Sequence, residues 1–243
     1  MSASFSVASA GASMLSNLPN PNPNIFLGLS ALTYGGAPTA NNAVYIPASV
    51  GSYMLLGTEV PSSFDLSTAN CFVESWVYFN SLSTTSQNII ARQYSGLSQL
   101  QLSVNSTSVS FAAKQAVGGT GINSTNTFSL STGQWYHIAG SWNLQTLTLN
   151  VFINGFGGNS ITMTSPLFLP WTPVTIGASY AFSGFNDYYI QDIRMTKGGN
   201  VPTGNFTPVQ GPFPNASPTY VTGMGPVVLS LNSTYISPVI TMR

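Results

Sequence analysis

The sequence predicts an all-β protein, a sandwich of two antiparallel sheets with an extended arm at each end. Three observations predict this fold. Apolar and polar residues alternate over many short segments, Gly and Asn turns separate these segments, and no stretch combines helical periodicity with helix caps. The 243 residues, 43% of them hydrophobic, are enough to bury one large core.

Residues 1–40 are predicted to form an extended N-terminal arm. Three prolines at alternate positions in NLPNPNPN, residues 17–24, remove amide donors and force extended geometry on the preceding asparagines. The apolar segment FLGLSALTY, residues 26–34, is expected to pair with a sheet edge, either of its own sandwich or of a neighbouring subunit.

Residues 41–200 are predicted to form the sandwich. In TLTLNVFING, residues 146–155, four aliphatic side chains from Leu147 to Ile153 share one face, and Asn154-Gly155 is a turn dipeptide. FVESWVYF (72–79) is apolar on both faces and predicts a central strand. Further strands are expected in LQLSV (100–104), SVSFAA (108–113), VTIG (174–177) and YYIQDIRM (188–195).

Residues 201–243 are predicted to form a proline-rich strap followed by one or two strands. The strap is VPTGNFTPVQGPFPNASP, and the strands lie within GPVVLSLNSTYISPVITMR. This part is expected to pack on the sandwich or on another subunit.

Charge is scarce: only 4% of residues are charged, against roughly 25% in ordinary soluble domains. The surface must therefore consist mostly of Ser, Thr, Asn, Gln and Gly. Five basic residues cannot make a phosphate-tracking stripe, so we expect no nucleic-acid partner. No apolar run reaches the roughly 18 residues of a membrane helix, and the start lacks the pattern of a secretory signal. The single cysteine, Cys71, is expected to pack as a small hydrophobe.

A series of motifs in order resembles the laminin-G-like, concanavalin A-like jelly-roll domains over residues 41–214. The segments are GSYMLL (51–56), FDLSTANCFVESWVYF (64–79), NIIAR (88–92), GQWYHIAGSWNLQTLTLNVFING (133–155), VTIGAS (174–179) and FNDYYIQDIRMTKG (185–198). NFTPVQGPFP (205–214) is similar to an extension that follows this domain in structural proteins of phages and large DNA viruses. The resemblance implies a two-sheet antiparallel jelly roll that binds sugars, binds proteins or builds structure.

The acids are not arranged for catalysis. Glycoside hydrolases need paired carboxylates, but Glu74 has no acid two residues away. Asp187 and Asp192 are five residues apart and would face opposite sides of a regular strand. His137 lies within a strand pattern, with no nucleophile motif in the chain. The sequence therefore predicts a protein that is not an enzyme and has no cofactor. A calcium ion held by Asp187, Asn186 and loop carbonyls is the alternative left open.

Two groups of side chains stand out. The first is structural: Glu74 shares a strand face with Trp76, so its carboxylate must be paired, and Arg194 is the expected partner. His137 is expected to hydrogen-bond beside tryptophan within the sandwich. The full structural set is Glu74, Trp76, Trp135, His137, Trp142 and Arg194. The second group is aromatic and could stack sugars or contact other subunits: Trp171, Tyr180, Phe182, Phe185, Tyr188 and Tyr189.

Two functions remain open. The first is a non-enzymatic structural subunit of a virus particle, such as a minor capsid, vertex or fibre component, whose arms contact other virion proteins or copies of itself. The scarcity of charge, the apolar arms and the resemblance of NFTPVQGPFP favour it, and its location would be the virion. The alternative is a carbohydrate-binding, lectin-like surface module that meets glycans outside the cell or at its surface.

Overall fold

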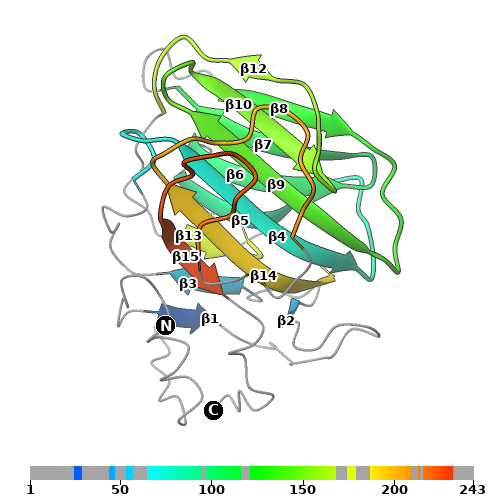
Figure 1. The fold of residues 1–243 in the computed structure, drawn as a ribbon. Coiled ribbons are helices and arrows are strands. Elements are labelled where there is room, and N and C mark those ends of the chain that lie inside the picture. The colour runs from blue at the N-terminus through cyan, green and yellow to red at the C-terminus, as the bar shows by residue number, and fades with distance from the viewer. Residues whose placement is uncertain are drawn as a thin grey trace.

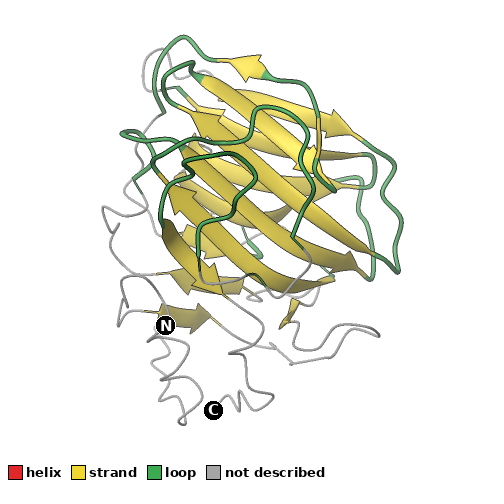
Figure 2. Ribbon diagram, in the orientation of Figure 1, coloured by secondary structure: helices red, strands yellow, loops and turns green. Residues whose placement is uncertain are grey.

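Two antiparallel sheets lie face to face in the computed structural model (Figure 1). The structure describes residues 25–28, 44–46, 53–56, 65–94, 97–115, 121–167, 174–178, 187–209, 213 and 216–231. These residues form strands and loops and no helix (Figure 2). The predicted all-β sandwich is confirmed.

Among the described residues, one sheet has seven strands and the other has eight. The seven-stranded sheet runs in the order β1 (Ile25–Gly28), β3 (Tyr53–Leu56), β13 (Val174–Ile176), β5 (Gln87–Tyr94), β6 (Leu97–Asn105), β7 (Ser108–Lys114) and β8 (Gly121–Thr127). The eight-stranded sheet runs in the order β11 (Phe156–Gly157), β10 (Thr148–Ile153), β9 (Trp135–Asn143), β4 (Cys71–Phe79), β14 (Tyr188–Lys197) and β15 (Val227–Leu231). In addition, β2 (Val44–Ile46) pairs with β14, and β12 (Ile161–Thr162) pairs with β10.

The alternation of side chains places one face of each strand in the core between the sheets. Leu149, Val151 and Ile153 of β10 are buried there, as predicted. Leu147 packs against the same core, but its positive φ of 54° places it in the turn before the strand begins rather than in the strand. Cys71 is fully buried in the same core, and burial raises the pKa of its thiol.

The turn after β10 has the backbone that its sequence predicts. Asn154 and Gly155 have φ angles of 51° and 80°. A Cβ at Gly155 would lie 1.9 Å from the carbonyl oxygen of Phe206, so this position requires glycine for space as well as for its φ.

The edge of β8 is bonded by β11 and by the segment that follows it. The amide of Asn159 donates to Thr125 O at 3.2 Å, and Asn126 Nδ2 donates to Phe156 O at 2.9 Å. These bonds join the two sheets at one side of the sandwich and occupy groups that an edge strand would otherwise expose.

The N-terminal segment pairs with its own sandwich. Ile25–Gly28 lies antiparallel to β3 at the other edge of the seven-stranded sheet. This is one of the two alternatives predicted for FLGLSALTY; the rest of the arm lies outside the described residues.

The described part of the strap, taken here with the two residues that follow it as 201–209, 213 and 216–220, packs on the outer face of the eight-stranded sheet, and Figure 1 shows it crossing in front of the strands. A second apolar cluster forms beneath it. Its members come from three strands and from the chain after β14: Phe72, Ala139, Phe152, Val201, Phe206, Tyr220 and Met224. The strap is followed by one described strand, β15, which pairs with β14. Packing on the sandwich is one of the two alternatives expected for this part, and the described strap residues and β15 adopt it.

Candidate functional site

The outer face of the eight-stranded sheet has two neighbouring regions. The strap covers the first, which contains a buried ion cluster around Glu74. The second lies beyond the strap and carries a row of half-exposed aromatic side chains. The first region fixes the strap in place, and the second is the candidate functional site.

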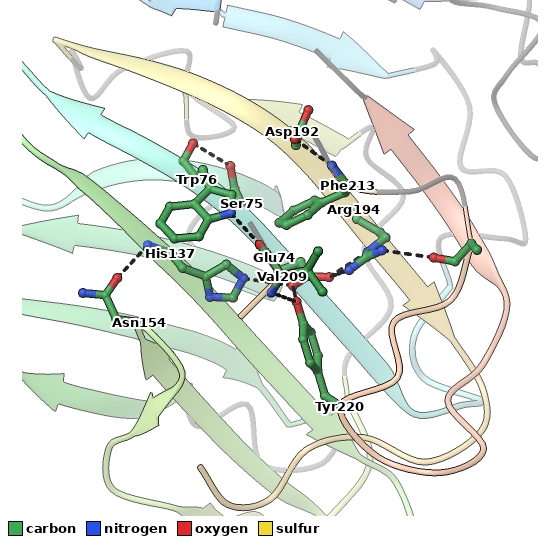
Figure 3. Close-up of polar contacts among 11 residues, drawn as sticks. Glu74, Ser75, Trp76, His137, Asn154, Asp192, Arg194, Val209, Phe213 and Tyr220 are labelled. Carbon is green, nitrogen blue, oxygen red and sulfur yellow. Dashed lines mark hydrogen bonds and ion pairs between the residues drawn. The ribbon is translucent and has the colours of Figure 1, made fainter. Parts of the chain in front are cut away.

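Glu74 on β4 is the centre of the buried cluster (Figure 3). Arg194 on β14 donates from Nε to Glu74 Oε1 at 2.7 Å, and its Nη2 lies 2.6 Å from the same oxygen. Tyr220 of the strap donates its hydroxyl to Glu74 Oε2 at 2.8 Å. The pairing of Glu74 with Arg194 that the sequence predicted is therefore present. Burial and the Glu74 carboxylate raise the pKa of Tyr220.

His137 on β9 completes the cluster. Its Nε2 lies 2.9 Å from Glu74 Oε2, and because an ionised carboxylate can only accept, Nε2 is the donor. The side chain of Asn154 accepts a bond from the backbone amide of His137 at 2.9 Å. The ring of Trp76 packs edge-on against His137 at 5.3 Å between centroids, as expected for a histidine beside tryptophan. His137 is fully buried, so its role is to hold the carboxylate.

Four further contacts attach the strap to the sheet. Trp76 Nε1 donates to Val209 O at 3.1 Å, and Asp192 Oδ2 accepts from the amide of Phe213 at 2.8 Å. Arg194 Nη1 donates to Ala216 O at 3.1 Å, and the guanidinium lies 4.6 Å from the centre of the Phe213 ring. These contacts come from strands β4 and β14, so the strap crosses both.

A β-bulge at Asp192 sets which residues of β14 face the strap. The pairing with β4 shifts between Gln191 and Ile193, and Asp192 has a φ of 54°. The extra residue keeps Ile193 in the core and places Arg194 opposite Glu74 on the outer face. The prediction that Asp187 and Asp192 face opposite sides is wrong, because it assumed a regular strand. Both carboxylates bond groups on the outer face.

The aromatic ladder is the row formed by Tyr45, Tyr189, Tyr78 and Trp135, which occupy directly paired positions on β2, β14, β4 and β9. All four side chains are half-buried, so each presents part of its ring to solvent. The ring centroids lie 4.9 Å apart for Tyr45 and Tyr189, 6.0 Å for Tyr189 and Tyr78, and 5.5 Å for Tyr78 and Trp135. The ladder thus crosses four strands as one continuous aromatic surface.

Hydrogen-bonding groups border the ladder at the ends of the strands. Asp187 Oδ1 accepts from the hydroxyl of Tyr45 at 2.9 Å and from Asn80 Nδ2 at 3.2 Å. Burial is the main cause that raises the pKa of Tyr45, and the hydrogen bond to Asp187 raises it further. Asn80 is exposed, and Gln191 is half-buried next to Tyr189 on the same face. Apolar ring faces and polar side chains therefore meet along one line.

The predicted aromatic contact group is only partly supported. Tyr189 lies in the ladder, but Tyr188 is fully buried between the sheets and donates its hydroxyl to Asn88 O at 2.8 Å. Tyr188 is therefore a core residue, because adjacent residues of a strand point to opposite faces. The remaining four predicted residues lie outside the described part of the chain: Trp171, Tyr180, Phe182 and Phe185.

The structure adds three residues to the candidate site. Tyr45 and Tyr78 were not predicted as contacts, and Trp135 was assigned to the scaffold. Tyr78 shares the outer face of its strand with Glu74 and Trp76, a pattern visible in FVESWVYF. The ladder itself depends on the register between four strands that are distant in sequence, and no local pattern contains that register. By contrast, Trp142 is fully buried in the core, as a scaffold residue should be.

Within the described residues, no group of three or more His, Cys, Asp or Glu side chains could hold a metal ion. For the calcium alternative, Asp187 is described and bonds Tyr45 and Asn80, whereas Asn186 lies outside the described part. A search of the same residues for a helix long and apolar enough to cross a membrane finds none.

The chain is similar to known proteins both in sequence family and in fold. The family model described as the concanavalin A-like lectin/glucanases superfamily matches residues 49–197, more than half of the chain. No curated protein matches the sequence.

Several solved structures are similar. The binding domain of botulinum neurotoxin DC, in complex with rat synaptotagmin II, superposes with a TM-score of 0.51 and 12% identity over 68% of this chain and 41% of that one. Botulinum neurotoxin type C, whose cell entry depends on interaction with two ganglioside molecules, superposes with a TM-score of 0.52 and 12% identity over 68% of this chain and 41% of that one. The binding domain of botulinum neurotoxin serotype D superposes with a TM-score of 0.52 and 14% identity over 68% of this chain and 42% of that one. The chain spans about two-fifths of the length of these structures, and at such low identity the likeness shows the fold alone.

Proposed function

Because the chain belongs to the concanavalin A-like lectin/glucanases superfamily, we propose that it is a carbohydrate-binding surface module, and that the aromatic ladder is its binding surface. The observation that carries this proposal is the half-exposed row of Tyr45, Tyr189, Tyr78 and Trp135 beyond the edge of the strap. The setting of the module would be extracellular, at a cell surface or at the outside of a virus particle.

The chemistry of the ladder suits a sugar. A pyranose ring has faces of polarised C–H groups, and the negative faces of aromatic rings attract such groups. The hydroxyls around the sugar need donors and acceptors at the rim. Asn80, Gln191 and Asp187 offer amides and a carboxylate beside the ladder. An aromatic surface with few convergent polar groups is the usual composition of a small-molecule site.

We propose that the module binds without hydrolysing. Hydrolysis needs two carboxyl groups that reach the glycosidic bond. Both oxygens of Glu74 are occupied by Arg194, His137 and Tyr220, and the side chain is fully buried under the strap. Asp192 is buried and bonded to the strap. Asp187 is the remaining described acid near the ladder.

The experiment is a glycan array probed with the full chain, followed by calorimetric titration of the best oligosaccharide. Tyr78→Ala and Trp135→Ala should each weaken binding by about tenfold or more, the typical effect of removing an aromatic anchor. Phe156→Ala is the matched control, because Phe156 is an aromatic residue 67% exposed but placed on β11, outside the ladder. Equal binding by Tyr78→Ala, Trp135→Ala and Phe156→Ala would refute the proposed site.

A second candidate is a structural subunit of a virus particle that contacts other virion proteins or copies of itself. The outer face of the seven-stranded sheet supports it. Paired positions on β7 and β8 carry Ser110 and Thr125, which are uncharged, polar and half-buried. Such a face offers little charge repulsion to a neighbouring subunit.

The test of this second candidate is the association state at increasing protein concentration. Sedimentation of the full chain is compared with that of a chain lacking residues 1–24, which precede β1. If the arm joins subunits, only the full chain should form larger species. Monomers from both chains at high concentration would contradict a role of the arm in assembly.

A further inference from the structure

We infer that the aromatic ladder selects neutral oligosaccharide chains and rejects acidic ones, an inference that rests on the proposed glycan-binding function. Three features of the described residues carry it: the absence of cations near the ladder, the carboxylate at one end of it, and the tilt between its rings.

The basic side chains of the described residues are all remote from the ladder or buried. Arg194 is fully buried against Glu74, and Arg92 is buried on β5 of the other sheet. Lys114 ends β7, also on the other sheet. Lys197 lies on β14, eight residues from Tyr189, a separation of roughly 27 Å along a strand. At physiological salt, charges are largely screened beyond about 8 Å. Within the described chain, the ladder therefore has no cation to pair with a carboxylate or sulfate of a sugar.

The charge that does border the ladder is negative. Asp187 is half-buried, and the groups bonded to its Oδ1 are a tyrosine hydroxyl and an amide, both neutral. An uncompensated carboxylate at this place repels an acidic sugar. It attracts the hydroxyls of a neutral sugar, because a carboxylate can accept several hydrogen bonds.

The shape of the ladder indicates a single soluble chain of several sugars. Adjacent strands lie about 4.8 Å apart, so four strands extend the ladder to roughly 14 Å, longer than one pyranose ring. The ring planes are inclined by 32° between Tyr45 and Tyr189, by 72° between Tyr189 and Tyr78, and by 54° between Tyr78 and Trp135. Such rings cannot form one plane against a flat crystalline polysaccharide, but they can follow a flexible chain.

The test uses hexasaccharides in matched pairs that differ only in the carboxylate: β-1,4-linked glucose against glucuronate, and β-1,4-linked mannose against mannuronate. Affinities are measured with the full chain at low and high salt. The neutral member of a pair that binds should bind at least about fivefold more tightly at low salt, the effect of one like charge near the site. The difference should shrink as salt rises.

Asp187→Asn separates selectivity from binding itself. This variant keeps an oxygen that can accept from Tyr45 and should narrow the difference between neutral and acidic members. Asp65→Asn is the matched control, because Asp65 bonds Ser67 in the loop before β4 and lies outside the ladder. Equal or tighter binding of the acidic members, or unchanged selectivity in Asp187→Asn, would overturn the inference while leaving glycan binding intact. If no hexasaccharide of either kind binds, the proposed function fails and this inference fails with it.

Discussion

Replacement of Glu74 by Gln should be strongly destabilising, although the two side chains have nearly the same shape. The carboxylate accepts from Arg194, His137 and Tyr220. A glutamine has one oxygen in place of two, so its NH₂ group must face one of these donors. The change also leaves the Arg194 guanidinium fully buried without its counter-charge.

Removing one partner of a buried ion pair costs about 3–5 kcal/mol, because the other charge stays buried and uncompensated. Domains are stable by about 5–15 kcal/mol, so the expected loss is roughly a fifth or more of the total stability. Urea denaturation, monitored by circular dichroism, measures the change. Asp187→Asn serves as the comparison, because Asp187 Oδ1 accepts from the neutral groups of Tyr45 and Asn80, with an expected loss of about 1 kcal/mol.

The double variant Glu74→Gln/Arg194→Met tests the mechanism of that loss. Because the uncompensated cation is then absent, the double variant should lose less stability than the two single variants together, with a coupling of about 1–3 kcal/mol. A loss below about 1 kcal/mol in Glu74→Gln, or strict additivity in the double variant, would refute the view that the uncompensated Arg194 cation causes the loss of stability.

Three further outcomes are expected. The pKa of Tyr220 in the folded chain lies above its ordinary value of 10.0. The stability that the neutral phenol contributes is therefore present below pH 10 and declines as the pH rises above 10. Tyr220→Phe should flatten this decline in denaturation curves measured at pH 9 to 11. Gly140→Ala should cost about 1–3 kcal/mol in urea, since a Cβ there would lie 2.5 Å from the ring of Phe111, whereas Gly204→Ala, with open space around it, should be neutral. His137→Gln should reduce the free energy of unfolding by about 1–3 kcal/mol through the loss of its bond to the buried carboxylate, seen as a lower melting temperature, and should leave the affinity of the ladder for its glycan within twofold.

The fold was predictable because its signals are local. The alternation in β10 and the turn at Asn154-Gly155 are both contained in ten consecutive residues. The partner of Glu74 was predictable for a related reason: a carboxylate on a largely apolar strand needs a cation, and the chain has few.

The candidate site was not predictable in the same way. Tyr188 and Tyr189 are adjacent in sequence, and only the register with β4 and β2 determines which of them reaches solvent. The bulge at Asp192 changes the alternation within β14 and has no clear signature in YYIQDIRM. Four aromatic residues became one surface only after four strands were aligned.

The central claim is that the ladder binds glycan, and the indole N–H signals of the tryptophans test it most directly. The chain has four tryptophans, of which Trp135 lies in the ladder and Trp142 in the core. In a protein labelled with ¹⁵N at tryptophan, addition of the best neutral oligosaccharide should shift the Trp135 signal, assigned by its loss in Trp135→Phe, and leave the Trp142 signal in place. Saturable binding without any shift of the Trp135 signal would contradict the account.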